Sequence, residues 1–204
     1  MNIFLTSQAS RVMSRVAQIL PKNPKEMKLA FIPTAGDPWG DNKPWMDADR
    51  KMLVDLGFQV EDFDLKNKTE EETRKILEDF DVLFVAGGNT FYLLNEAKKS
   101  GFDKVAREMV KVGKIYIGSS AGSYLACPTI IAAGWKHADR NQVGLKDLSA
   151  LGLVDFIVTA HYTDDYKEAV EKGKKTTNLK VVTLTDSQFI VSDGNNYKII
   201  KNRD

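Results

Sequence analysis

The residues best suited to chemistry lie in a turn between an apolar run and a segment with helical spacing. The pattern Gly-x-Ser-x-Gly occurs there as Gly118-Ser119-Ser120-Ala121-Gly122. Small residues around a serine let the backbone turn sharply from a strand into a helix, which lifts the central hydroxyl clear of the sheet. Backbone N–H groups at the start of that helix suit a developing oxyanion. We therefore predict that Ser120 is a nucleophile, with a phosphate-binding or structural turn as the alternative.

A serine hydroxyl needs a base within hydrogen-bonding reach, and the chain has two histidines. His161 follows the apolar run at residues 156–160, so we expect it at the carboxyl end of a strand, where open α/β sheets bind ligands. Ser120 is expected at the same edge. His137 lies in a polar stretch with no strand before it, which is typical of a loop histidine. His161 is therefore the predicted base.

A carboxylate that orients the imidazole completes such a site. Asp186 lies in a turn after the apolar run Val181–Leu184, which again indicates the end of a strand. Asp164 and Asp165 compete for this role, although they are equally suited to capping the helix that follows them. The other competitors are Asp139 and Asp155. The residues alone leave the third member open.

A second glycine turn, Gly87-Gly88, follows the apolar run Val82–Val85. Glycine lets a backbone N–H approach a substrate oxygen closely, so this turn is a candidate for the second oxyanion donor. The alternative is an ordinary turn in which Asn89 or Thr90 caps a helix.

A long loop at residues 33–45 carries two of the three tryptophans, Trp39 and Trp45. Loops at strand ends often hold binding residues, and aromatic side chains are common in the walls of substrate pockets. We expect these indoles either to line a pocket or to pack as part of a surface loop.

The elements that must position these residues alternate along the chain. Short apolar runs predict strands at Asn2–Leu5, Leu29–Ile32, Gln59–Phe63, Val82–Val85, Ile115–Ile117 and Ile157–Thr159. Amphipathic spacing predicts helices at Arg11–Leu20, Trp45–Leu56, Thr69–Asp79, Tyr92–Lys99, Phe102–Val112 and Asp165–Lys175. This alternation is typical of a parallel sheet covered by helices. After about residue 180, turn residues between the runs Val181–Leu184, Gln188–Val191 and Tyr197–Ile200 favour antiparallel hairpins.

Length and composition narrow the classes of protein. The 204 residues fit a single domain over 1–204, and a net charge of +1 provides no overall field to attract nucleic acid or an anionic membrane. One cysteine and two histidines cannot build a tetrahedral Cys/His zinc site. The N-terminus lacks the regions of a signal peptide, and no apolar stretch approaches the ~20 residues that span a bilayer. We expect a cytoplasmic protein with no metal and no organic cofactor.

Three segments together resemble the serine peptidase family of dipeptidase E (aspartyl dipeptidase), which is related to cyanophycinase. They are Gly87-Gly88-Asn89-Thr90, the turn at Gly118–Gly122, and Thr159-Ala160-His161-Tyr162. The resemblance runs from the first predicted strand to the hairpins after Asp186. It implies a fold similar to class I glutamine amidotransferases: a flavodoxin-like α/β sandwich of three layers, with a mostly parallel sheet between helices and antiparallel hairpins near the C-terminus.

The resemblance also implies roles for particular residues. The family's nucleophile maps onto Ser120, its base onto His161, and its oxyanion donors onto the amides of Gly88 and Ala121. Its acid maps onto Asp186, where related sequences more often have glutamate, and Asp139 is the alternative.

The implied activity is hydrolysis of short peptides, of which Asp-Xaa dipeptides are one candidate class. The family holds a substrate carboxylate with basic side chains after the histidine, but residues 162–175 contain lysines and no arginine. Lysine lacks the fork that suits a carboxylate, so aspartate specificity does not follow. We expect a short peptide as the partner of a monomer or homodimer. The alternatives are an esterase that uses the same serine turn and a non-catalytic domain that binds a small molecule.

Overall fold

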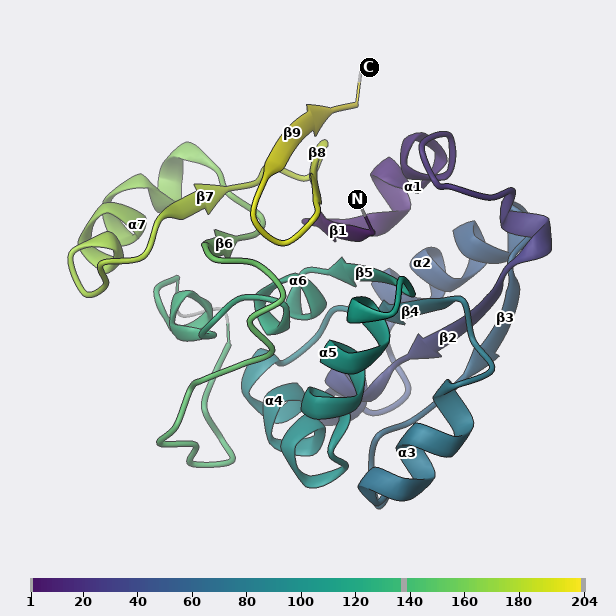
Figure 1. The fold of residues 1–204 in the computed structure, drawn as a ribbon. Coiled ribbons are helices and arrows are strands. Elements are labelled where there is room, and N and C mark those ends of the chain that lie inside the picture. The colour runs from purple at the N-terminus through teal and green to yellow at the C-terminus, as the bar shows by residue number, and fades with distance from the viewer. Residues whose placement is uncertain (1, 137–138, 203–204) are drawn as a thin grey trace.

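In the computed structural model, which describes residues 2–136 and 139–202, a seven-stranded sheet forms the centre of the molecule, in the order β3-β2-β4-β5-β1-β8-β9 (Figure 1). These strands are β1 (Ile3–Thr6), β2 (Lys28–Ile32), β3 (Gln59–Asp62), β4 (Val82–Val85), β5 (Ile115–Ser119), β8 (Gln188–Ser192) and β9 (Tyr197–Lys201). Strands β1 to β5 pair in parallel, whereas β8 pairs antiparallel with both β1 and β9. The predicted α/β fold with a mostly parallel sheet is confirmed.

Helices cover both faces of this sheet. One face packs against α1 (Ala9–Ala17) and α2 (Pro44–Asp55), and the other against α3 (Glu70–Leu77), α4 (Thr90–Lys99), α5 (Phe102–Lys111) and α6 (Ala121–Leu125). In β4 the side chains alternate between the two cores: Val82 and Phe84 join the first, and Leu83 and Val85 the second. A strand that is apolar on both faces is suited to a position between two helical layers.

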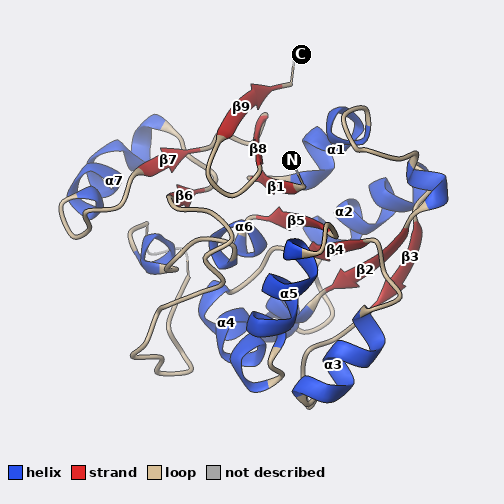
Figure 2. Cartoon of the chain, viewed as in Figure 1, coloured by secondary structure: helices blue, strands red, loops and turns tan. Residues whose placement is uncertain are grey.

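Strands β6 (Ile157–Thr159) and β7 (Val181–Thr183) form a separate parallel pair (Figure 2). The 3-10 helix η4 (Asp164–Tyr166) and helix α7 (Lys167–Lys174) make the crossover that a parallel pair requires. The predicted antiparallel hairpin is confirmed for β8 and β9. The run before it differs, because β7 takes β6 as its partner and a turn at Thr185–Gln188 leads the chain back into the main sheet.

The remaining connections contain short 3-10 helices: η1 (Pro24–Glu26), η2 (Thr34–Trp39) and η3 (Ile131–Gly134). Helix η2 takes up part of the long tryptophan-bearing loop, and α2 begins at Pro44, whose fixed φ suits the first turn of a helix. Within the described residues, no helix is long and apolar enough to cross a membrane.

Candidate active site

The predicted nucleophile lies in a strained turn between β5 and α6. Ser120 has φ 47° and ψ −104°, a conformation that costs free energy for a residue with a Cβ. Glycines make the turn possible, since a Cβ on Gly118 would lie 2.6 Å from the carbonyl carbon of Gly122, and one on Gly122 would lie 2.1 Å from Val85 O. The close packing of α6 on β4 and β5 thus holds Ser120 at the carboxyl end of β5.

The neighbouring strand β1 brings Ser7 to the same place. Thr6 lies opposite Ser119 in the pairing of β1 with β5, and Ser120 N–H donates to Thr6 O at 3.0 Å. Ser7 and Ser120 therefore follow two adjacent strands in register, and the Ser7 side chain is fully buried. Ser7 was not among the predicted site residues because no local motif marks it. Its position just after the first strand was the available signal.

The predicted base and acid follow β6 and β7, the separate two-stranded pair that is called the small sheet below. Parallel pairing of β6 with β7 brings the carboxyl ends of both strands together, and the contact continues beyond them, with Tyr162 N–H donating to Leu184 O at 2.9 Å. His161 follows β6 and Asp186 follows β7. Both residues therefore lie at the same end of this strand pair.

The structure brings Ser120, His161 and Asp186 into one hydrogen-bonded line. Ser120 Oγ lies 3.0 Å from His161 Nε2, and His161 Nδ1 lies 2.6 Å from Asp186 Oδ1. An ionised carboxylate only accepts, so Nδ1 carries the proton of a neutral imidazole and Nε2 is left to accept the hydroxyl proton of Ser120. The side chains of His161 and Asp186 are 45% and 35% exposed, so a substrate has access to this line.

Ser7 contacts both the histidine and the aspartate. Its hydroxyl donates to Asp186 Oδ1 at 2.7 Å and accepts from His161 N–H at 2.6 Å. His161 has φ 54°, an uncommon backbone conformation for a residue other than glycine, and the bond from its N–H to Ser7 holds it there. Ser7 thereby ties the small sheet to β1 of the main sheet.

Two opposing influences act on Asp186. Partial burial would raise its pKa, but the hydrogen bond from Ser7 and the interactions with His161 outweigh that effect and lower the pKa of Asp186. The carboxylate therefore stays ionised, as a partner for an imidazolium must.

The turn predicted to supply the second oxyanion donor lies against the serine turn. A Cβ on Gly88, whose φ is 148°, would lie 2.1 Å from Ala35 O, so glycine alone fits this close approach. A Cβ on Gly87 would lie 3.3 Å from the Cβ of Ser120. Asn89 also caps α4 as predicted, its side chain accepting from Tyr92 N–H at 2.9 Å.

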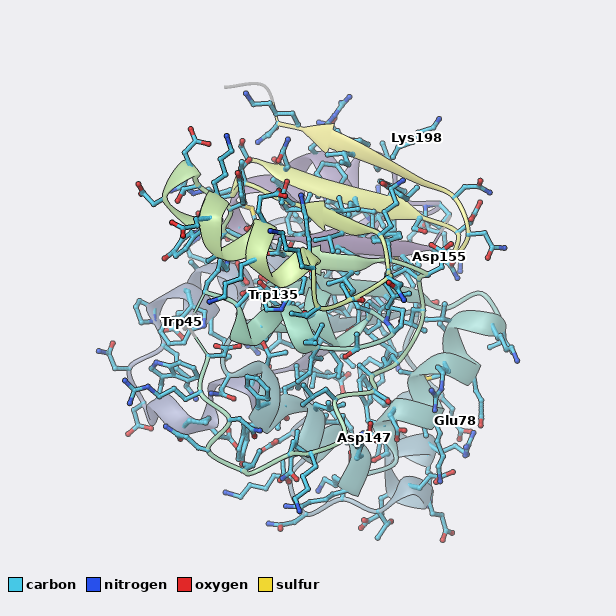
Figure 3. All side chains as sticks on the ribbon, turned by 90° about the vertical axis from the view of Figure 1, so that its left-hand side faces the viewer. Trp45, Glu78, Trp135, Asp147, Asp155 and Lys198 are labelled. Atoms are coloured by element: carbon cyan, nitrogen blue, oxygen red, sulfur yellow. The ribbon has the colours of Figure 1, made fainter. Side chains whose placement is uncertain are left out.

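The other candidates for the acid that the structure describes make no hydrogen bond to the His161 imidazole, although Asp139 lines the same cavity as His161. Asp139 accepts from Thr90 N–H at 2.9 Å, and Asp155 is an exposed residue on the opposite side of Figure 3 from Trp45. Asp164 and Asp165 are exposed in η4, where neither side chain caps the helix that follows. His137 lies outside the described residues.

Asp49 of α2 is a buried carboxylate that no sequence pattern marked. Its Oδ2 accepts from Ser119 Oγ at 2.8 Å, and its Oδ1 accepts from Ser10 N–H at 2.7 Å. Burial raises the pKa of Asp49, and the hydrogen bond from Ser119 partly opposes that rise. Asp49 thus joins the end of β5, at Ser119, to the first turn of α1 at Ser10.

A cavity of about 410 Å³ opens beside Ser120. Its walls include Trp39 and Trp45 from the tryptophan-bearing loop, so the prediction that these indoles line a pocket is the one the geometry supports. Within the part of the chain that the structure describes, no cluster of His, Cys, Asp and Glu side chains is arranged to hold a metal ion.

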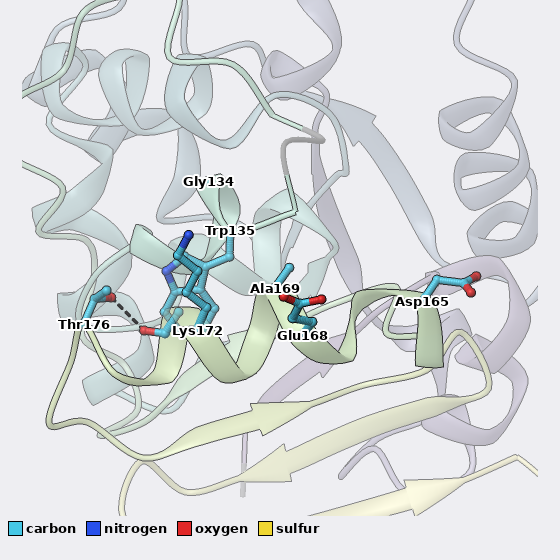
Figure 4. A pocket seen from close by; sticks show the side chains of 8 residues that line it. Gly134, Trp135, Asp165, Glu168, Ala169, Lys172 and Thr176 are labelled. Atoms are coloured by element: carbon cyan, nitrogen blue, oxygen red, sulfur yellow. Dashed lines mark hydrogen bonds between the residues drawn. The ribbon is translucent and has the colours of Figure 1, made fainter.

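A second cavity, of about 480 Å³, lies between Trp135 and α7 (Figure 4). A Cβ on Gly173 would lie 2.2 Å from the Trp135 ring, so the helix needs glycine where it passes the indole. Neither Ser120 nor His161 lines this second cavity, and no described residue lines both cavities. It is therefore separate from the candidate active site.

A sheet of parallel strands that ends in a strained serine, with a histidine and a carboxylate in line, is an arrangement typical of α/β hydrolytic enzymes. Comparison with known families identifies which group of such enzymes the chain belongs to. The model of Peptidase family S51 matches residues 3–200, and the chain belongs to this family. The protein is a peptidase, and the resemblance inferred from its sequence is confirmed.

Individual relatives agree with this assignment. An uncharacterized peptidase of Listeria monocytogenes is 35% identical over 84% of this chain and 83% of its own. Peptidase E of Salmonella arizonae is 34% identical, and the match covers 71% of this chain but 58% of that protein. A crystal structure of a candidate peptidase E protein from Listeria monocytogenes superposes with a TM-score of 0.86 at 30% identity and covers 99% of this chain and 98% of that one. A peptidase from an acI-B1 actinobacterium shares the fold, with a TM-score of 0.69 at 13% identity over 98% of this chain and 87% of that one.

Proposed function

We propose that the protein is a serine peptidase of short peptides, with Ser120 as nucleophile, His161 as base and Asp186 as the orienting acid. The observation that carries this proposal is the line of contacts from Ser120 Oγ to His161 Nε2 at 3.0 Å and from His161 Nδ1 to Asp186 at 2.6 Å. These are the distances over which a base takes the proton of a hydroxyl and an acid orients that base.

In the first half of the reaction, Ser120 Oγ attacks the carbonyl carbon of the scissile bond while His161 Nε2 takes its proton. The carbonyl oxygen becomes an oxyanion, and the backbone N–H groups of Gly88 and Ala121 donate to it. The C–N bond then breaks, and His161 gives its proton to the leaving amine. The acyl group remains on Ser120 as an ester.

In the second half, water attacks the ester and His161 takes a proton from it. Collapse of the second tetrahedral intermediate releases the carboxylic acid, and the proton returns from His161 to Ser120. Throughout, Asp186 stabilises the imidazolium form of His161, and the hydrogen bond from Ser7 keeps Asp186 ionised.

The size of the cavity supports short substrates. At about 410 Å³ it is at the small end of the range of roughly 300–1,000 Å³ typical of small-molecule sites. The relatives named Peptidase E support hydrolysis of peptides, and the match covers just over half of their length.

The test is product analysis by mass spectrometry after incubation of a dipeptide library with the wild-type protein and with Ser120→Ala. We expect cleavage by the wild type and a loss of about 10⁴- to 10⁶-fold in turnover for the variant, because removal of a serine nucleophile has effects of this size. Ser119→Ala is the matched control, since Ser119 precedes the nucleophile but donates to Asp49 instead. Wild-type turnover by Ser120→Ala would refute the mechanism.

An esterase would use the same serine, and the order of the residues argues against the usual α/β-hydrolase arrangement. That arrangement has the acid between serine and histidine, whereas here Asp186 follows His161 and Asp139 contacts Thr90. Turnover of an acyl ester without turnover of any peptide in the library would favour the esterase. Tight metabolite binding with no turnover would favour a non-catalytic domain.

A further inference from the structure

The cavity beside Ser120 has an aromatic wall. The rings of Trp39 and Trp45 meet edge to face with centroids 5.7 Å apart. Trp45 Nε1–H donates to Gly87 O at 3.4 Å, and a Cβ on Gly87 would lie 3.8 Å from Cδ1 of Trp45 and 3.3 Å from the Cβ of Ser120. The indole and Ser120 therefore both lie close to the point that a Cβ on Gly87 would occupy.

Apart from His161, the titratable side chains in the described lining of this cavity are carboxyl groups. They are Asp49 and Asp139, and burial raises the pKa of both. A rise in the pKa of a carboxyl group means that its negative charge is already unfavourable there. A third carboxylate brought in by a substrate would add repulsion to that cost.

Two cations are close enough to act on carboxylates of the site, Lys136 on Asp139 and Asp186 and Arg11 on Asp186, but neither lines the cavity. The Lys136 ammonium donates to Ala160 O and lies 5.1 Å from the ring centroid of Tyr166. Arg140 lines a separate small cavity of about 260 Å³, which shares Trp39. Among the described residues, no lysine or arginine lines the cavity beside Ser120. An acidic side chain would therefore find no lysine or arginine to pair with in this described lining.

We propose that this cavity binds an apolar side chain, preferably an aromatic one, of a residue next to the scissile bond, and that it disfavours aspartate. The inference rests on the proposed function, because it takes Ser120 as the group that attacks the neighbouring carbonyl. Aromatic side chains gain from edge-to-face contacts and from removal of their surface from water. Trp45 and Trp39 are then the residues that determine specificity.

The experiment compares kcat/KM for Phe-Ala, Ala-Phe, Asp-Ala, Ala-Asp and Ala-Ala. We expect phenylalanine at one position to raise kcat/KM about tenfold over Ala-Ala, and aspartate at that position to lower it. Trp45→Ala should abolish most of the gain through KM, so that the advantage of phenylalanine over alanine at that position largely disappears. Trp39→Ala, at a residue 42% exposed, should show the same pattern more weakly without risk to folding. Trp135→Phe is the matched control and should leave all five values unchanged.

A binding measurement separates this inference from the proposed mechanism. Titration of Ser120→Ala protein with the same dipeptides, followed by tryptophan fluorescence, reports on the cavity without turnover. Tighter binding of the phenylalanine dipeptide supports the inference even if no peptide is cleaved. Equal or tighter binding of the aspartate dipeptide, or no binding of either, overturns it. A preference for Asp-Xaa with a Ser120-dependent rate would overturn the proposed specificity but retain the mechanism. Equal losses for all five dipeptides in Trp45→Ala would also overturn the proposed specificity.

Discussion

The candidate site is assembled from two unequal parts of the molecule. Ser7 and Ser120 follow β1 and β5, which are central strands of the seven-stranded sheet with helical layers on both faces. His161 and Asp186 follow β6 and β7, a pair of three-residue strands outside that sheet. The strands before Ser7 and Ser120 pair within the large sheet, whereas the side chains of His161 and Asp186 are partly exposed and their short strands pair only with each other.

The difference shows where the alignment of the site depends on single contacts. Ser120 is fixed by the packing of glycines against α6, which involves many atoms. The small sheet depends more on individual bonds, and Ser7 provides two of them, to His161 N–H and to Asp186. Substitutions on the histidine side should therefore change catalysis with little change in stability, and substitutions around the serine turn should change both.

The largest effect is expected for His161→Ala. Loss of the proposed base should lower kcat by about 10⁵-fold or more, as for other members of serine triads, with little change in stability because the side chain is 45% exposed. Steady-state kinetics and thermal unfolding measure the two quantities. His137→Ala is the matched control and should keep wild-type kcat. An equal loss in both histidine variants would contradict the assignment of the base.

A smaller but still large effect is expected for Asp186→Asn. An amide at this position removes the charge that stabilises the imidazolium and permits the wrong tautomer of His161, so kcat should fall about 10⁴-fold. Asp139→Asn tests the alternative acid and should lower kcat far less, since Asp139 bonds Thr90. A larger loss of kcat in Asp139→Asn than in Asp186→Asn would contradict the assignment of Asp186 as the acid.

The sequence predicts the serine side of this comparison better than the histidine side. The turn around Ser120 is a local pattern, and its glycines are required by contacts within a few residues or with the next strand. The pairing of β6 with β7 is non-local, and a run such as Val181–Thr183 suits a hairpin as well as a parallel pair. His161 and Asp186 could be predicted because each follows a strand, whatever its partner. Ser7 and Asp49 could not, because their roles arise from packing between elements distant in sequence.

Ser7→Ala should break the connection between the two parts. A hydrogen bond to a charged group contributes about 1.5–3 kcal/mol, so kcat should fall about 10- to 100-fold while KM changes little. The control is Ser123→Ala: Ser123 is also fully buried and donates to Thr6 O, but it bonds neither His161 nor Asp186. It should keep kcat within about threefold.

A double-mutant cycle separates positioning from a general structural role of Ser7. If Ser7 acts through Asp186, Ser7→Ala should have much less effect on kcat in an Asp186→Asn background than in the wild type. Additive losses would mean that Ser7 supports the fold without orienting the acid.

The smallest effects concern the pH dependence of stability, where the two parts should differ in sign. The pKa of Asp186 is lowered in the folded state, so its contribution is present above the unfolded-state value of about 3.9 and is lost as the pH falls through the folded pKa. The pKa of Asp49 is raised, so the folded state holds its proton more tightly and stability falls as the pH rises from about 3.9 through the folded pKa.

Denaturant unfolding of two variants over a range of pH measures this contrast. Asp186→Asn should lose stability relative to the wild type at neutral pH, and the gap should close in acid. Asp49→Asn keeps an oxygen for Ser119 or Ser10 but carries no charge. The free energy of unfolding of this variant should therefore increase relative to that of the wild type as the pH rises. Parallel curves for the two variants would show that the buried carboxylate of α2 and the acid of the small sheet are in equivalent surroundings, and would remove the electrostatic half of the comparison.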